Sequence, residues 1–95
     1  MIPADLLDQL REKDPMLWIR VHANDFIGDV FTAWLQYCLQ EAIRARGWKY
    51  QILAGKHKPH VFIDTYDREA IIDCLSDTEA EALLISYLAA IQEAA

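Results

Sequence analysis

The chain has 95 residues and a formal net charge of −6 at pH 7, so it has room for one domain, 1–95, and not for a second core. Its apolar runs fall short of the roughly 18 residues that span a bilayer, and its first residues lack the basic and apolar regions of a signal peptide. We therefore expect a cytoplasmic protein with no membrane partner. Hydrophobic residues make up 54% of the chain, somewhat above the usual level of about 45–50%, and a protein partner is the first candidate to cover the surplus.

The first predicted element is a short amphipathic helix over 3–13. Pro3 suits a first helical position, and leucines recur at helical spacing until Asp14 and Pro15 end the pattern. The next residues, MLWIRVHA, alternate between Leu17, Ile19 and Val21 on one side and polar or aromatic residues on the other. This period of two predicts a strand over 16–23. A continued helix stays open as an alternative, because Leu17, Trp18 and Val21 also share a helical face.

A long helix is predicted over 25–46. Asn24 and Asp25 are good N-cap residues, no proline interrupts the segment, and Gly47 follows in the usual C-terminal position. Apolar residues cover more of this helix than the stripe that an ordinary surface helix carries. We therefore expect it to be covered on two sides, by a sheet and by other helices or a second subunit.

The remaining segments predict a hairpin and two helices. Two β-rich runs, 48–54 and 60–66, are joined by the turn-forming residues GKHKPH. Asp67 can cap a helix over 67–75, and Ser76 with Glu79 forms a capping box for a last helix over 77–94. The predicted fold class is α+β, with a three-stranded, mainly antiparallel sheet (16–23, 48–54 and 60–66) packed by the four helices.

The charges are distributed unevenly along the chain. Residues 1–41 hold three basic and seven acidic side chains, residues 42–63 hold five basic and no acidic ones, and residues 64–95 hold one basic and eight acidic ones. This basic segment predicts a contact with a negatively charged partner. Its candidate partner-binding residues are Arg44, Arg46, Lys49, Lys56, His57, Lys58 and His60. The acidic surface of the last two helices in a neighbouring copy is one such partner.

Metal binding and thiol chemistry find little support in the residue types. His57 and His60, with Asp64 beyond them, supply fewer ligands than a closed zinc site needs. A second cluster is formed by His22, Asp25 and Asp29. Its acidic residues are better explained by the start of a helix, where they stabilise the helix dipole. Cys38 and Cys74 fall in apolar segments typical of buried, reduced thiols. We therefore expect no catalytic residues, no cofactor and no metal.

Three functions remain open. The first is a small protein-interaction or regulatory module, expected to be a homo-oligomer such as a dimer, that acts through an apolar helix face and a basic hairpin tip. The second is nucleic-acid binding by the segment 44–58, where Trp48 and Tyr50 lie among the cations, although the acidic remainder of the chain disfavours it. The third is a small-ligand pocket or minor enzyme site near His22, Trp48, His60 and Asp64.

Overall fold

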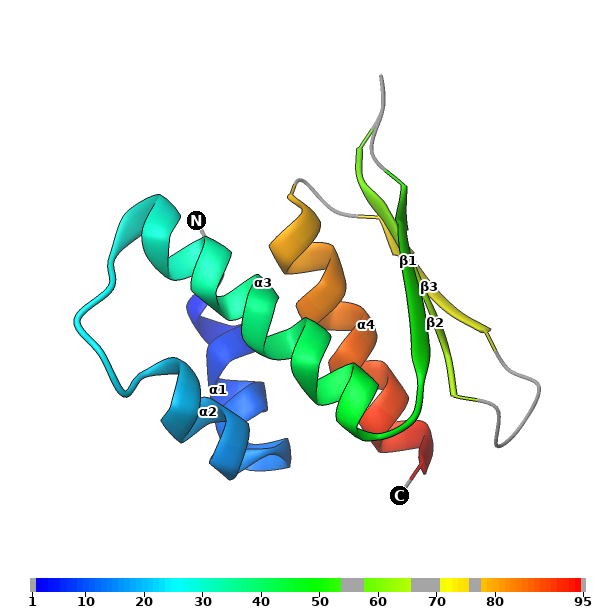
Figure 1. Cartoon of the computed structure of the whole chain (residues 1–95), viewed down its shortest axis with the longest axis horizontal. Coiled ribbons are helices and arrows are strands. Elements are labelled where there is room, and N and C mark those ends of the chain that lie inside the picture. Colours follow the sequence, from blue (N-terminus) through cyan, green and yellow to red (C-terminus); the bar gives the residue numbers. More distant parts are fainter. Residues whose placement is uncertain (1, 54–57, 66–70, 76–77, 95) are drawn as a thin grey trace.

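The computed structural model describes residues 2–53, 58–65, 71–75 and 78–94. Its elements run in the order α1, α2, α3, β1, β2, β3, α4, and the helices lie on one side of the sheet (Figure 1). Their bounds are α1 Ala4–Lys13, α2 Pro15–Val21, α3 Gly28–Ala45, β1 Lys49–Leu53, β2 His60–Asp64, β3 Ile71–Leu75 and α4 Glu79–Ala94. The predicted α+β class is confirmed.

The predicted strand 16–23 is wrong, because residues 16–21 belong to α2 and residues 22 and 23 follow it as a turn. Asp14 is the N-cap of α2: its Oδ1 accepts a hydrogen bond from the backbone N–H of Leu17 at 3.2 Å, and Pro15 follows at the first helical position. Leu17 and Val21 are buried on the inner side of the helix. The helical spacing that was kept as an alternative is therefore the correct interpretation, and Asp14 ends α1 while it begins α2.

The long helix was predicted correctly in its centre and C-terminus, but α3 begins at Gly28 instead of residue 25. It ends at Ala45, and Gly47, which follows the C-cap residue Arg46, has a φ of 77° in the left-handed region that glycine adopts without strain. The N–H of Trp48 then donates to the carbonyl of Ile43 at 3.1 Å. This tight exit turns the chain directly from α3 into β1.

The sheet has the order β1-β2-β3, with both pairs antiparallel. The two predicted strands of the hairpin, 48–54 and 60–66, correspond to the shorter β1 and β2, which pair from Lys49 opposite Asp64 to Leu53 opposite His60. Residues 54 and 66 lie outside the described part. The predicted helix 67–75 is wrong where it can be compared, since Ile71–Leu75 is strand β3 and residues 66–70 lie outside the described part. In β1 and β2, alternate residues face the helices, so Val61 and Ile63 are fully buried.

The last helix, α4, is the centre of the molecule and not a surface element. It packs against α1, α3, β2 and β3 (Figure 1). Leu83, Leu84 and Tyr87 are fully buried, and so is the polar residue Ser86. The apolar residues of α4 thus join those of α1, α2, α3 and the sheet in one core cluster.

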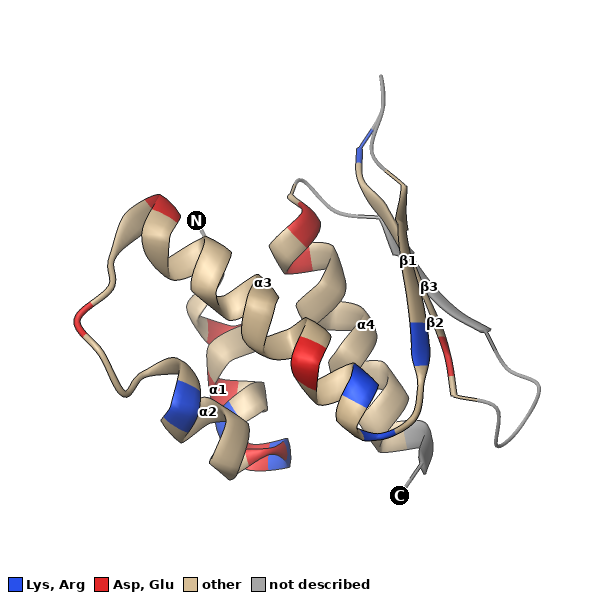
Figure 2. Cartoon of the chain, viewed as in Figure 1, with Lys and Arg blue, Asp and Glu red and all other residues tan. Residues whose placement is uncertain are grey.

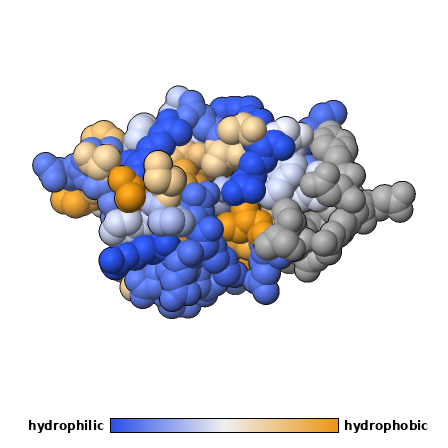
Figure 3. All heavy atoms as spheres, turned by 90° about the horizontal axis from the view of Figure 1, so that it is seen from below, coloured by the Kyte–Doolittle hydropathy of each residue, from blue (hydrophilic) through white to orange (hydrophobic). Residues whose placement is uncertain are grey.

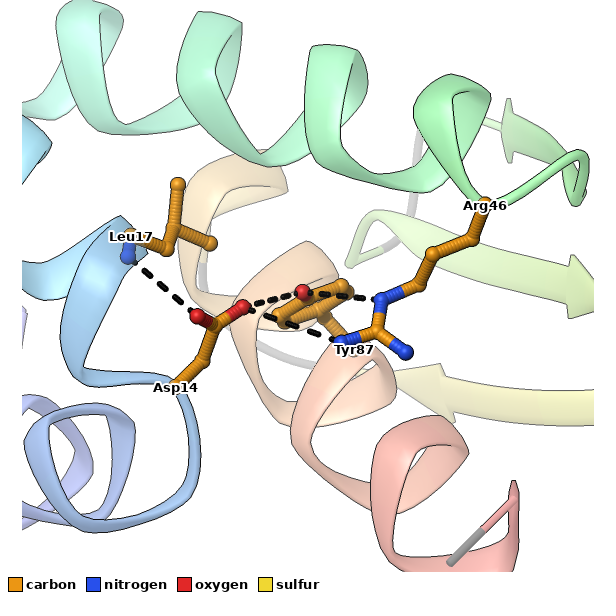
Figure 4. Close-up of polar contacts among 4 residues, drawn as sticks. All are labelled: Asp14, Leu17, Arg46 and Tyr87. Carbon is orange, nitrogen blue, oxygen red and sulfur yellow. Dashed lines mark hydrogen bonds and ion pairs between the residues drawn. The ribbon is translucent and has the colours of Figure 1, made fainter.

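One partly buried polar network lies at the edge of this core (Figure 4). The hydroxyl of Tyr87 donates to Oδ2 of Asp14 at 2.6 Å and accepts from Nε of Arg46 at 3.3 Å, while a terminal nitrogen of Arg46 lies 3.9 Å from the same Asp14 oxygen. Burial, and then the hydrogen bond to Asp14, raise the pKa of Tyr87 to about 12. The network ties the α1–α2 corner and the end of α3 to α4.

The remaining sequence expectations concern cysteines and membranes. Cys38 is a free, fully buried thiol, and burial raises its pKa, as expected for an inert core cysteine. Among the described residues, no helix combines the length and apolar character needed to cross a bilayer.

Candidate protein-interaction surface

Large apolar side chains are exposed along one side of α3 and the residues just before it. Ile27 is 82% exposed, Val30 58%, Tyr37 45% and Phe26 43%. Ala33 is exposed and Trp34 half-buried between them. We refer to this group as the α3 surface, which comprises Phe26, Ile27, Val30, Ala33, Trp34 and Tyr37. Scattered apolar side chains are normal on a protein surface, but here four lie within the first three turns of α3 and two lie directly before it, so the six are neighbours.

The aromatic rings of the α3 surface are packed against each other. Phe26 meets Trp34 edge-on at 5.9 Å between ring centroids, and Trp34 stacks on Tyr37 at 5.6 Å. The guanidinium of Arg20, from α2, lies 5.8 Å from the Trp34 ring centroid. These contacts limit the motion of three large side chains before any partner arrives, which lowers the entropy lost on binding.

Charged groups border the α3 surface and hold it to α2. Glu41 accepts hydrogen bonds from the hydroxyl of Tyr37 at 2.6 Å and from the guanidinium of Arg20. The bond from Tyr37, followed by that from Arg20, lowers the pKa of Glu41, so the carboxylate stays ionised at neutral pH. Asp25 and Asp29 are exposed at the opposite, N-terminal end of the surface.

More apolar side chains lie beyond this helix. Met16 and Ile19 are exposed on α2. In Figure 3, apolar side chains lie among hydrophilic ones towards the end of the molecule that holds α2 and its connection to α3. Among the described residues, the exposed large apolar side chains thus lie mostly on the helical side, with Leu53 on β1 as the exception.

The sequence predicted a wide apolar helix face but not which part of it is exposed. Leu35, Leu39 and Ile43 are fully buried against the rest of the protein, whereas Ile27 and Val30 are open to solvent. Helix periodicity shows that two faces are apolar. It cannot show that α4 covers one and that α2 covers only part of the other, since this depends on the tertiary arrangement.

The described residues of the basic segment do not form one continuous site. Arg44 and Arg46 lie at the end of α3, with Lys49 close by at the start of β1, whereas Lys58 precedes β2 at the other end of the hairpin (Figure 2). Arg44 donates to the hydroxyl of Tyr50 at 3.0 Å. Arg46 also lies over the Trp48 and Tyr87 rings, at 5.2 and 5.7 Å.

At the hairpin tip, the structure places only part of the predicted contact. Lys58 is exposed, and the half-buried His60 packs on Phe62 at 4.2 Å between ring centroids. Lys56 and His57 lie outside the described residues. The expected acidic surface on the last two helices is not formed as predicted, because residues 71–75 are a strand.

The four residues of the predicted pocket do not come together. His22 stacks on Trp18 at 4.3 Å on α2, and Trp48 is buried beside Tyr87, while His60 and Asp64 lie at opposite ends of β2. Asp64 instead helps to line an open hollow of about 550 Å³ beside the hairpin, together with Lys49, Tyr50, Gln51 and Phe62. Among the described residues, that lining includes no histidine, cysteine or serine.

The metal hypothesis gains no support from the described residues. No group of three or more His, Cys, Asp or Glu side chains within them is arranged to hold a metal ion. Of the two histidines in the predicted loop motif, only His60 belongs to the described part of the chain.

Comparison of the chain with known proteins adds no information about function. No family model, curated protein or solved structure matches it.

Proposed function

We propose that the protein is a protein-interaction module whose binding site is the α3 surface. The observation that carries this proposal is the exposure of Ile27, Val30 and Tyr37 on one side of α3, next to aromatic rings already fixed by mutual packing. Aromatic side chains with a polar tip are common anchors of protein interfaces.

The chemistry of the α3 surface fits a protein better than a small molecule or a nucleic acid. Its centre is apolar and its rim is charged, with Asp29 at one end and the Arg20–Glu41 ion pair beside Tyr37. An apolar centre with a polar rim is the usual anatomy of a protein interface. The acidic N-terminal end would repel a phosphate backbone.

The partner is a protein that buries these apolar side chains. A homo-oligomer, as expected from the sequence, would use this same surface. The basic hairpin tip, represented by Lys58, lies on the sheet at the other side of the molecule and is a secondary contact at most.

A photo-crosslinking amino acid at position 30 tests the proposal in cells that produce the protein. We expect a covalent protein adduct that mass spectrometry identifies, and binding of that partner in purified form should weaken at least tenfold with Tyr37→Asp. The same crosslinker at position 8, which is exposed on α1, is the control. An adduct yield at position 30 no higher than at position 8 would exclude the α3 surface as a binding site.

A further inference from the structure

We infer that the α3 surface binds a second copy of the chain, with the two α3 helices antiparallel about a twofold axis. This inference rests on the proposed function and names its partner. It is carried by the spacing of exposed residues along α3 and by the opposite charges at the two ends of the helix.

The exposed residues of α3 follow the spacing of a helix–helix seam. Val30, Ala33, Tyr37, Gln40 and Arg44 are separated alternately by three and four positions, and each is exposed or half-exposed. Such spacing, 3.5 residues on average, keeps side chains in line along one side of a helix, so that another helix can pack lengthwise on them. In Figure 1, α3 crosses the front of the molecule with no other element before it.

The two ends of this seam carry opposite charges (Figure 2). Asp29 is in the first turn of α3, with exposed Asp25 just before the helix, whereas Arg44 is in the last turn. Glu41, three positions before Arg44, is ion-paired with Arg20, so Arg44 is the net charge at this end. A complementary helix must therefore be basic where α3 begins and acidic where α3 ends. The same helix in reverse orientation meets both requirements, and its dipole opposes that of the first.

The alternative orientation is electrostatically worse. Two parallel α3 helices would bring Asp29 beside Asp29 and Arg44 beside Arg44, which places like charges together at both ends. Arg44 remains able to reach a partner, because its hydrogen bond to Tyr50 is exposed and uses one of its five N–H donors.

A plausible register follows from side-chain size. With the twofold axis passing between Ala33 and Tyr37, the small Ala33 of each copy faces the large Tyr37 of the other, and Val30 faces Gln40. At about 1.5 Å per residue, Asp29 and Arg44 then lie about 9 and 14 Å from the midpoint, so the pair from opposite copies is within side-chain reach. Each interface contains this pair twice, as twofold symmetry requires.

Charge reversal in the purified full-length chain tests this arrangement. In sedimentation equilibrium, Asp29→Arg alone and Arg44→Glu alone should each raise the dimer dissociation constant at least tenfold, because each places like charges together in both symmetric contacts. A 1:1 mixture of the two variants should recover the wild-type dissociation constant, since the heterodimer contains one reversed and one original pair.

Matched variants separate this effect from loss of structure. Asp8→Arg reverses an exposed acid on α1, and Tyr50→Phe removes the hydrogen bond of Arg44 without changing charge, so neither should alter dimerisation. Circular dichroism checks that each variant is folded.

Two results would overturn the inference. One is a wild-type chain that stays monomeric at millimolar concentration, and the other is a dimer that the charge reversals do not weaken or the mixture does not restore. If the chain is monomeric but position 30 crosslinks to a different protein, the proposed function stands while the second copy is excluded as its partner. If neither occurs, both fail.

Discussion

Tyr87 makes polar contacts that join distant parts of the chain. Its hydroxyl lies between Asp14 and Arg46 in the interior (Figure 4). Removing it in Tyr87→Phe leaves the carboxylate of Asp14 without its closest partner. We expect this to lower the free energy of unfolding by about 1–2 kcal/mol, measured by urea denaturation at pH 7. Tyr50→Phe, which removes a solvent-exposed hydrogen bond, is the matched control and should cost less.

The raised pKa of Tyr87 makes stability depend on alkaline pH. The folded state favours the protonated hydroxyl. The contribution of this hydroxyl to the free energy of unfolding is therefore complete below the ordinary tyrosine pKa of 10 and is lost as pH rises towards about 12. Urea denaturation at several pH values from 8 to 12 should show a steeper loss of stability for wild type than for Tyr87→Phe. Parallel pH curves for the two proteins would contradict this role.

Ser86 is a buried polar residue with no hydrogen-bond partner for its Oγ within the described structure. Its hydroxyl has lost water without gaining a protein contact, and alanine is also a better helix former. We expect Ser86→Ala to raise the free energy of unfolding by about 1 kcal/mol. The reverse change at another fully buried position of α4, Ala90→Ser, should lower it by a similar amount. No gain on Ser86→Ala would mean that the hydroxyl has a partner after all.

At the scale of elements, the exit from α3 depends on Gly47. A side chain there would meet no atom within 4 Å, so the only cost of Gly47→Ala is the left-handed backbone conformation. We expect a loss of about 1 kcal/mol in thermal or urea denaturation. Gly47→Asn should lose less, because asparagine adopts this conformation more readily. Equal losses of stability in the two variants would show that the backbone φ of residue 47 does not determine the cost of substitution at this turn.

The fold class, α1, α3, α4 and the β1–β2 hairpin could be predicted from the sequence, since each has a clear period or turn composition. The error at α2 came from reading Asp14 and Pro15 only as the end of a helix. Their order, N-cap residue then proline, is equally the start of one. If Asp14 and Pro15 are taken as the start of a helix, the helical alternative for Leu17, Trp18 and Val21 becomes the better prediction.

The error at β3 and the position of the binding surface have a different origin. Ile71–Leu75 is a short strand, and what fixes it is pairing with β2, a contact between segments that local propensity does not describe. Likewise, α3 has two apolar sides in sequence, and only the packing of α4 against Leu35 and Leu39 leaves Val30 and Tyr37 exposed. Both errors concern which elements pack or pair with each other in the tertiary structure.

At the scale of the whole molecule, the proposed dimer links stability to protein concentration. Dimerisation on the α3 surface would stabilise the native state by mass action, so the melting temperature should rise by a few degrees for each tenfold increase in concentration. Val30→Asp should abolish this dependence. Leu53→Asp, which changes an exposed apolar residue on the sheet, should leave it intact. A melting temperature independent of concentration in wild type would argue against dimer formation.

The hydrogen bond between Asp14 and Tyr87 closes a separation of 73 positions in a chain of 95. Contacts between such distant segments are slow to form, because the entropy of closing the intervening loop must be lost first. The hairpin and the individual helices can form earlier from local contacts. A contact that forms only after the folding transition state leaves the folding rate unchanged and lowers the unfolding rate. The network of Asp14, Arg46 and Tyr87 would then govern how long each native molecule persists before it unfolds.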